Sequence, residues 1–148
     1  MSDDLSRIDL PRYVESLSQF LLQSSARNAA DIQLVTNVAS LSLSIETAVP
    51  CGLIINELLT NAIRHAFHGK KEGVIRIEIK EDKDNIVSLI IVDNGIGMSS
   101  TAVSGDTKAL GLTLVRELVM QLHGSMEEPG GPGTVFRIFF PLETGSGP

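Results

Sequence analysis

The chain has 148 residues, 43% of them hydrophobic, and a formal net charge of −6, which fits one domain with its own core and disfavours nucleic acid as the main partner. Its single cysteine excludes a disulfide framework within the chain. No apolar run reaches the roughly 18 residues of a membrane span, and the acidic N-terminus does not resemble a signal peptide, so we expect a cytoplasmic protein without direct membrane contact.

The first predicted elements are a tail, a helix, two strands and a second helix. Residues 1–9 are polar and predict a tail. Apolar residues then recur at helical spacing over residues 10–23, which predicts an amphipathic helix. Short strands are expected at residues 32–35 and 41–45. A long and mostly apolar helix follows over residues 46–67.

The middle of the chain predicts two strands and a loop. Residues 74–80 alternate isoleucine or valine with charged side chains, which is typical of a strand with one buried face. Residues 86–92 are nearly all apolar and predict a strand at the centre of a sheet. Residues 93–109 are rich in glycine, serine and threonine and predict a loop.

The last elements are a helix over residues 111–123, with Gly124 as its C-cap, and a strand over residues 134–140. The inward side chains of this helix are expected to be Leu114, Val115, Leu118, Val119 and Leu122. The order of elements predicts an α+β fold with one mixed sheet and helices on one face. One domain is expected over residues 10–143, followed by a tail at 144–148.

The helix over residues 46–67 carries polar groups among apolar ones. At about 3.6 residues per turn, one face holds Glu57, Asn61, Arg64 and His68. Burying such groups without partners is costly, so this face is expected to meet a ligand.

A second polar cluster, Asp93 to Gly97, directly follows the apolar strand. A carboxylate accepts hydrogen bonds and cannot donate them, so Asp93 suits the exocyclic amino group of adenine and would repel the carbonyl of guanine. Gly95 and Gly97 permit close approach of the backbone to a flat ring. The same residues also fit an ordinary turn.

A third cluster, Leu110-Gly111-Leu112, is expected to open the helix that follows the loop. Exposed N–H groups at a helix start bind phosphate, although Gly111 would also suit a plain transition from loop to helix. The familiar glycine-rich phosphate loops are missing from the sequence.

In order and spacing, the three clusters resemble the ATP-binding domain shared by histidine kinases, Hsp90-type chaperones, type II topoisomerase ATPases and mismatch-repair ATPases (the GHKL or HATPase_c group). Residues 57–67 resemble the N box, residues 93–97 the G1 box and residues 110–112 the end of the G2 box. Gly133-Thr134 and the final strand match the closing segment. The resemblance implies a two-layer α/β sandwich of the Bergerat type, with a mostly antiparallel sheet.

Within that group, the N box is most similar to histidine kinases of the HWE and HisKA_2 type. Gly111-Leu112-Thr113-Leu114-Val115 also fits that subgroup. Two departures from ordinary histidine kinases agree with it: no F box precedes Leu110, and Lys108-Ala109 stands where a glycine-rich approach is usual.

The resemblance implies roles for individual residues. Asn61 would hold Mg²⁺, and Glu57 would orient a metal-bound water or act as a base. Arg64 and His65 would lie near the phosphates, as would the amides of Gly111 and Leu112, next to Leu110. Asp93 would read adenine beside Gly95, Gly97 and Thr134, under a lid formed by residues 98–109.

A histidine kinase needs an acceptor histidine, and none of His65, His68 and His123 lies in a recognisable acceptor motif. We therefore expect a catalytic fragment that acts on a separate histidine-containing dimerisation domain, with a response regulator downstream. Two alternatives stay open: an ATP-dependent serine kinase and binding module of the anti-sigma-factor type, and an ATPase with Glu57 as the base for water.

Overall fold

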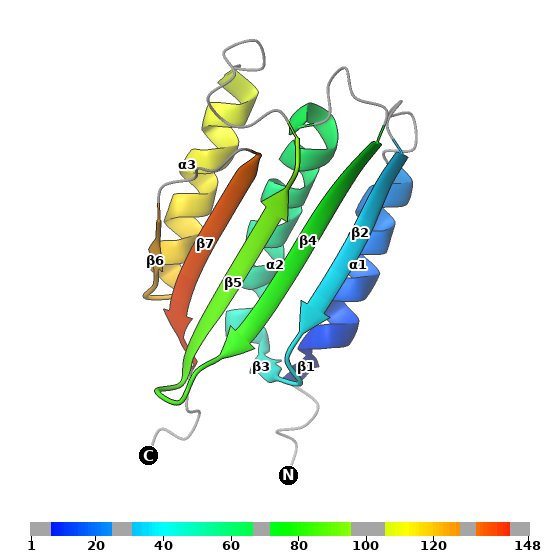
Figure 1. Ribbon diagram of the computed structural model, residues 1–148. Helices are drawn as coiled ribbons and strands as arrows, with labels where there is room; N and C mark the ends of the chain where they lie inside the picture. The colour runs from blue at the N-terminus through cyan, green and yellow to red at the C-terminus, as the bar shows by residue number, and fades with distance from the viewer. Residues whose placement is uncertain (1–6, 25–30, 67–71, 96–105, 128–132, 143–148) are drawn as a thin grey trace.

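The computed structural model describes residues 7–24, 31–66, 72–95, 106–127 and 133–142. Within these ranges, three α-helices cover one face of a five-stranded sheet, and a small two-stranded sheet lies at one end (Figure 1). The strand order of the larger sheet is β2-β4-β5-β7-β6, and only β2 and β4 pair in parallel. The predicted α+β fold, with a mixed and mostly antiparallel sheet under one layer of helices, is confirmed.

The two-stranded sheet joins β1 (Arg7–Asp9) to β3 (Ser42–Ser44) in antiparallel register. Polarity alone predicts a tail through residue 9, but Arg7 fixes this segment to the domain. Its Nε donates to Oγ of Ser42 at 3.0 Å and its Nη2 to the carbonyl of Ser42 at 2.7 Å. Residues 7–9 are therefore ordered as a strand and not as part of a tail.

The helix α1 (Leu10–Ser24) matches the predicted amphipathic helix closely. Leu10 and Val14, one turn apart, are fully buried against the core. Apolar spacing at one-turn intervals is the signal that made this helix predictable.

The helix α2 (Ile45–Asn61) is the central helix, packed against both α1 and α3. Ser44 caps its start, because the Ser44 hydroxyl accepts a hydrogen bond from the N–H of Thr47 at 3.3 Å. The helix continues into a π-helical turn, η2 (Ala62–Ala66). The single helix predicted over residues 46–67 is thus an α-helix with a wider last turn.

The sheet consists of β2 (Asp31–Val38), β4 (Glu72–Glu81), β5 (Ile86–Asp93), β6 (Ser125–Met126) and β7 (Thr134–Pro141). The isoleucines of β4 face the helices and are at most 1% exposed, as the alternation predicts: Ile75, Ile77 and Ile79. β5 is the middle strand, also as predicted. β2 is longer than predicted because Thr36 and Asn37, which carry no apolar signal, continue its pairing with β4.

The helix α3 (Asp106–Gln121) begins five residues earlier than the predicted start at Gly111. Four of its predicted inward residues are buried: Val115, Leu118, Val119 and Leu122. The prediction for Leu114 is wrong, since this side chain is 42% exposed. Leu114 lies about 100° around the helix from Val115 and so reaches only the margin of the buried face.

The end of α3 is closed by His123 rather than by Gly124. His123 has a φ of 59°, its N–H bonds to the carbonyl of Met120, and the N–H of Gly124 bonds to the carbonyl of Val119. This is the Schellman pattern with a left-handed histidine. The predicted glycine cap is therefore wrong by one residue. None of the described helices has the length and apolarity of a membrane span.

Candidate functional site

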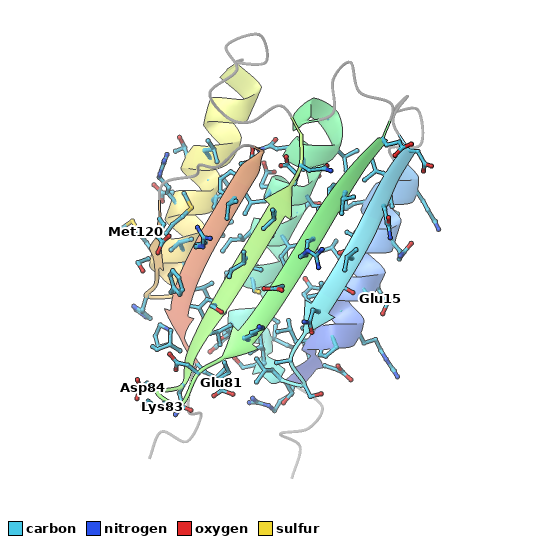
Figure 2. All side chains as sticks on the ribbon, viewed as in Figure 1. Glu15, Glu81, Lys83, Asp84 and Met120 are labelled. Atoms are coloured by element: carbon cyan, nitrogen blue, oxygen red, sulfur yellow. The ribbon has the colours of Figure 1, made fainter. Side chains whose placement is uncertain are left out.

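The predicted site residues that the structure describes gather at one end of the molecule. β5 rises from the turn that holds Lys83 and Asp84 and ends at Asp93 at the opposite end, where β7 also begins (Figures 1 and 2). The C-terminal end of α2 and the N-terminal half of α3 lie at this same end (Figure 1). Three segments far apart in sequence are therefore brought together.

The first part of the site lies where α2 meets α3. A Cβ placed on Gly111 of α3 would lie 2.7 Å from Oε1 of Glu57 and 3.5 Å from Nδ2 of Asn61. Both of these side chains are half-buried on α2, one turn apart. The absence of a side chain at Gly111 is what leaves room for this carboxylate and amide between the two helices.

The Asn61 amide group is incompletely satisfied. Its Nδ2 atom is buried and has no hydrogen-bond partner. Buried polar atoms without partners are rare in folded proteins and call for an explanation, such as a position for a ligand or a water. Of the described side chains, only Ser18 also has a buried polar atom in this condition, and Ser18 lies on α1.

The position of Gly111 corrects one prediction. Gly111 is the sixth residue of α3 and does not open the helix. Inside an α-helix the N–H bonds to the carbonyl four residues earlier, so the amides of Gly111 and Leu112 are engaged in the helix rather than exposed at its start. The prediction that these two amides form an exposed helix start is therefore wrong.

The π-helical turn η2 carries Arg64 and the backbone of His65. Arg64 is exposed. π-helical turns are rare and occur frequently at functional sites. The wider turn also shifts residues after Asn61 away from the regular α-helical phase, so the predicted alignment of Arg64 with Glu57 and Asn61 does not follow from α-helical geometry.

The second part of the site is the end of β5. Asp93 is 6% exposed, and its Oδ1 accepts a hydrogen bond from the N–H of Gly95 at 2.8 Å. Thr134, the cross-strand neighbour of Asp93 on β7, is 5% exposed. A buried carboxylate beside a buried hydroxyl at a strand end is typical of a polar binding position rather than of a plain surface turn.

Gly133 allows β7 to approach β5 closely at this point. A Cβ on Gly133 would overlap the backbone carbonyl oxygen of Asp93 and lie 3.0 Å from Cα of Asn94. Because those atoms belong to the backbone, any side chain here would push Asp93 out of place. Glycine at position 133 therefore permits the observed position of Asp93.

Asn94 was not singled out from the sequence, yet it locks the end of β5 to β4. Its Oδ1 accepts from the N–H of Val74 at 2.8 Å, and its own N–H donates to the carbonyl of Val74 at 3.2 Å. An asparagine directly after a buried strand was the available signal, because its side chain bonds readily to nearby backbone.

Several predicted features fall outside what the structure describes. These are Gly97, His68, most of the predicted lid over residues 98–109, and the side chains of His65 and Leu110.

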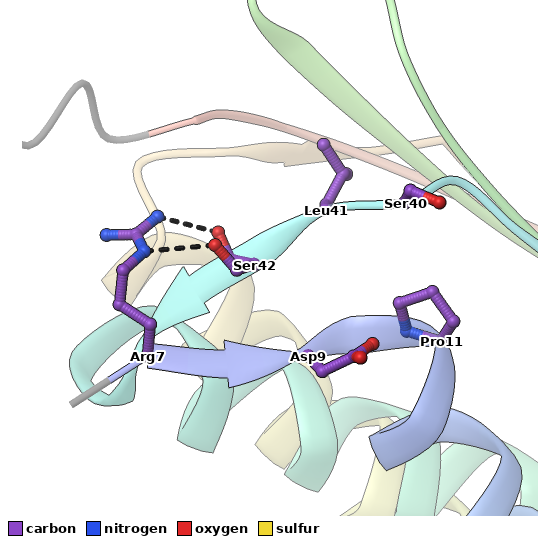
Figure 3. Close-up of a pocket in the computed structure, with 6 residues that line it drawn as sticks. All are labelled: Arg7, Asp9, Pro11, Ser40, Leu41 and Ser42. Atoms are coloured by element: carbon purple, nitrogen blue, oxygen red, sulfur yellow. Dashed lines mark hydrogen bonds between the residues drawn. The ribbon is translucent and has the colours of Figure 1, made fainter. Parts of the chain in front are cut away.

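A cavity of about 600 Å³ lies by the two-stranded sheet, at the end of the molecule opposite to the C-terminal end of β5 (Figure 1). Figure 3 shows its lining residues, with Arg7 already held by Ser42. Because the arginine is engaged in joining β1 to β3, this cavity has a structural explanation, and we place the candidate site at the other end.

The chain matches a model of a known protein family. The model for histidine kinase-, DNA gyrase B- and HSP90-like ATPases matches residues 47–144. These residues include all three predicted clusters.

Two kinds of curated relative are similar to the chain. Blue-light-activated histidine kinase 2 of Erythrobacter litoralis is 27% identical over 136 residues, which cover 91% of this chain and 39% of the kinase. The anti-sigma F factor of Priestia megaterium is 27% identical over 82 residues, which cover 55% of this chain and 56% of that protein. The chain thus spans well under two thirds of these relatives.

Solved structures of histidine kinases are also similar to the chain. The histidine kinase domain of the Erythrobacter litoralis blue-light kinase EL346 matches with a TM-score of 0.78 and 28% identity, over 91% of this chain and 62% of that one. The mycobacterial sensor histidine kinase MprB matches with a TM-score of 0.71 at 19% identity, over 93% of this chain and 98% of that one, which shows a shared fold. The resemblance to the HWE and HisKA_2 subgroup fits the similarity to the blue-light kinase.

Proposed function

The chain belongs to the family of histidine kinase-, DNA gyrase B- and HSP90-like ATPases, and from this premise we propose that it is the Mg-ATP-binding catalytic domain of a two-component sensor histidine kinase. In this proposal the γ-phosphate of ATP passes to a histidine on a dimerisation domain outside this chain. A response regulator then receives the phosphate. The reaction consumes ATP, and we place it in the cytoplasm.

The adenine would bind at the end of β5. Asp93 would accept from the exocyclic amino group, since a carboxylate can accept several hydrogen bonds and its Oδ1 also accepts from the N–H of Gly95. Thr134 lies beside it on β7. Gly95 and Gly97 leave room for the ring. The burial of Asp93 supports this assignment, because a desolvated carboxylate discriminates strongly between donors and acceptors.

The phosphates would bind at the end of α2. Asn61 would hold Mg²⁺ through its side-chain oxygen, the ligand type that this cation prefers, and Glu57 lies one turn earlier on α2. When bound, the cation neutralises phosphate charge. Arg64 and His65 lie on the next turn and would meet the phosphates, and Leu110, Gly111 and Leu112 would flank them from α3.

The chain's own groups would act chiefly by positioning and charge compensation. Phosphoryl transfer requires little covalent chemistry from the protein, and its barrier is lowered by holding donor and acceptor in line. Glu57 would orient a water molecule bound to the cation, or serve as a base. Its place against Gly111 keeps its carboxylate beside Asn61.

One observation carries the proposal: the buried and unpartnered Nδ2 of Asn61, in the gap that Gly111 leaves beside Glu57. An unsatisfied amide donor between two helices suits a ligand with acceptor oxygens, such as a phosphate group. A ligand at this end of α2 accounts for it.

The phosphorylated product tests the proposal. The chain, Mg-ATP and a separate histidine-containing dimerisation domain of a similar kinase are incubated together. We expect phosphate on that domain that is released by acid, as phosphohistidine is. Asn61→Ala should abolish the transfer while the fold, followed by circular dichroism, is kept. Full transfer by this variant would contradict the role of Asn61.

The similarity to anti-sigma F factors supports a second candidate, a serine kinase that binds a protein partner in an ATP-dependent manner. Its product would be an acid-stable phosphoserine on the partner. Steady ATP hydrolysis without any acceptor would instead support a GHKL ATPase with Glu57 as the base for water.

A further inference from the structure

β2 leaves a long edge of the five-stranded sheet without a strand partner among the described residues. β2 has eight residues, whereas β6 at the other edge has two. Unpaired edges attract other strands, and natural proteins commonly block them with lysine, proline or a bulge. β2 has no lysine, proline or break in its register with β4, and its one charge is the first residue, Asp31.

The hydrogen bonding of β2 shows which backbone groups reach the free edge. The N–H of Ala39 donates to the carbonyl of Ile79 at 2.8 Å, in continuation of the parallel ladder between β2 and β4. Along a strand, successive residues direct their backbone groups to alternate sides, so the odd-numbered residues pair with β4. The even-numbered residues direct N–H and C=O groups outward: Ile32, Leu34, Thr36 and Val38.

We propose that β2 pairs antiparallel with β2 of a second copy of this chain, around a two-fold axis at Val35. This register places Leu34 opposite Thr36 and Ile32 opposite Val38 of the second copy. All four outward residues then exchange hydrogen bonds. A register centred on Leu34 would leave Val38 opposite residue 30, outside β2, and would lose part of the ladder.

The side chains of β2 are self-complementary in this register. On the open face of the sheet, Val35 meets its own counterpart, and Gln33 lies opposite Asn37, each with an amide that donates and accepts. Asp31 lies opposite Ala39, so no like charges oppose one another. Each patch contacts the same patch of its partner, as a two-fold dimer requires. The matched amides of Gln33 and Asn37 and the absence of opposed like charges favour a second copy over an unrelated peptide as the occupant.

The axis stands perpendicular to the sheet, so both copies keep their helices on the same side. The two five-stranded sheets would become one continuous sheet. Asp93 lies on β5, which β4 separates from β2, so the pairing at the β2 edge does not involve the strand that carries Asp93.

Two matched double variants test the register. Gln33→Glu with Asn37→Glu places carboxylates opposite one another in both cross-axis pairs, whereas Gln33→Lys with Asn37→Glu places opposite charges there. Both variants share the glutamate next to Glu78 of β4 and differ only at residue 33. Sedimentation equilibrium of the 148-residue chain reports the mass relative to 15.9 kDa for one copy.

We expect a dimer for the natural chain, retained in the Lys/Glu variant and weakened by about ten-fold or more in the Glu/Glu variant. A monomer at all concentrations up to the millimolar range overturns the proposal. A dimer equally strong in both variants also overturns it, because the interface must then lie elsewhere.

Amide hydrogen exchange of the natural chain tests the pairing without any variant, and so does not depend on whether the variants fold. The amide protons of Leu34 and Thr36 should exchange more slowly as protein concentration rises, while the amides of β6 should not change. Exchange that is independent of concentration at these two amides contradicts the pairing.

Discussion

At the residue scale, Asp93 accepts a hydrogen bond from the N–H of Gly95 and is also the residue that we propose binds adenine. Asp93→Asn keeps an oxygen that accepts from the N–H of Gly95, so the fold should survive. The new amide would present a donor to the adenine amino group, itself a donor. We expect nucleotide binding to be lost, with an unchanged melting transition. Unchanged affinity for ATP in calorimetric titration would remove the adenine role from Asp93.

Cys51 gives a second prediction at this scale. Burial raises the pKa of the Cys51 thiol to about 12, whereas the pKa of an exposed thiol is about 8.5. The folded state therefore binds the thiol proton more tightly than the unfolded state does. The contribution of this group to the free energy of unfolding is complete below about pH 8.5 and is lost as pH rises towards 12.

Between pH 8 and pH 10, this group should lower the free energy of unfolding by about 1–2 kcal/mol. Urea unfolding under reducing conditions measures it. Cys51→Ala is the matched control, because it removes the thiol and leaves every other titrating group. An identical decrease in the natural chain and in this variant would show that Cys51 does not contribute.

Asn61 and Asp93 stood out in the sequence as polar residues among apolar ones, which are costly to bury; the structure places Asn61 half-buried and Asp93 buried, and their roles stay predictions. Asn94 did not stand out, since its role depends on bonds to Val74 across the sheet. A capping role for His123 was readable from its place at the helix end, but its left-handed conformation was not, because the closing bonds at the end of α3 impose it while the adjacent Gly124 has the more usual residue type.

At the scale of elements, two glycines control how neighbouring elements meet, and their substitution should have different outcomes. Gly111→Ala meets the end of the flexible Glu57 side chain. Since alanine also favours helix, unfolding free energy should change by less than about 1 kcal/mol, while phosphotransfer falls because Glu57 is displaced.

Gly133→Ala instead meets the backbone of Asp93. We expect it to destabilise the protein by about 1–3 kcal/mol, as overpacking does. Chemical unfolding of both variants gives the comparison. Equal stability loss in the two variants would contradict the contacts assigned to these glycines.

The buried face of α3 offers another test at the element scale. Leu118 is 5% exposed and Leu114 is 42% exposed. Leu118→Ala should cost about 2–5 kcal/mol in unfolding free energy, and Leu114→Ala less than about 1 kcal/mol. A similar loss of unfolding free energy in both variants would indicate that Leu114 is buried, as the sequence pattern predicts.

The start of α3 could not be read from sequence. Asp106 to Ala109 contain no apolar periodicity, and glycines precede them, so the pattern predicts a loop up to Gly111. The strand β4 was readable because its isoleucines alternate with charged residues and one face is buried. Periodicity thus predicted elements with one buried face and failed at helix ends, which depend on local capping.

At the scale of the whole molecule, the sheet order places the end of β5 next to the start of β7, and the helix layer places Gly111 next to Glu57 and Asn61. The sequence order of the three clusters predicted that they share a site, through the family resemblance. The direct contact between α2 and α3 required the structure, because it depends on how two helices pack.

Mg-ATP binding to the 148-residue chain, measured by isothermal titration calorimetry against Mg-GTP as the control, tests the central claim most directly. The account predicts saturable binding of ATP below millimolar concentration and no measurable binding of GTP, since the guanine carbonyl would face the Asp93 carboxylate. Failure of ATP to bind at millimolar concentration, or equal binding of GTP, would contradict it.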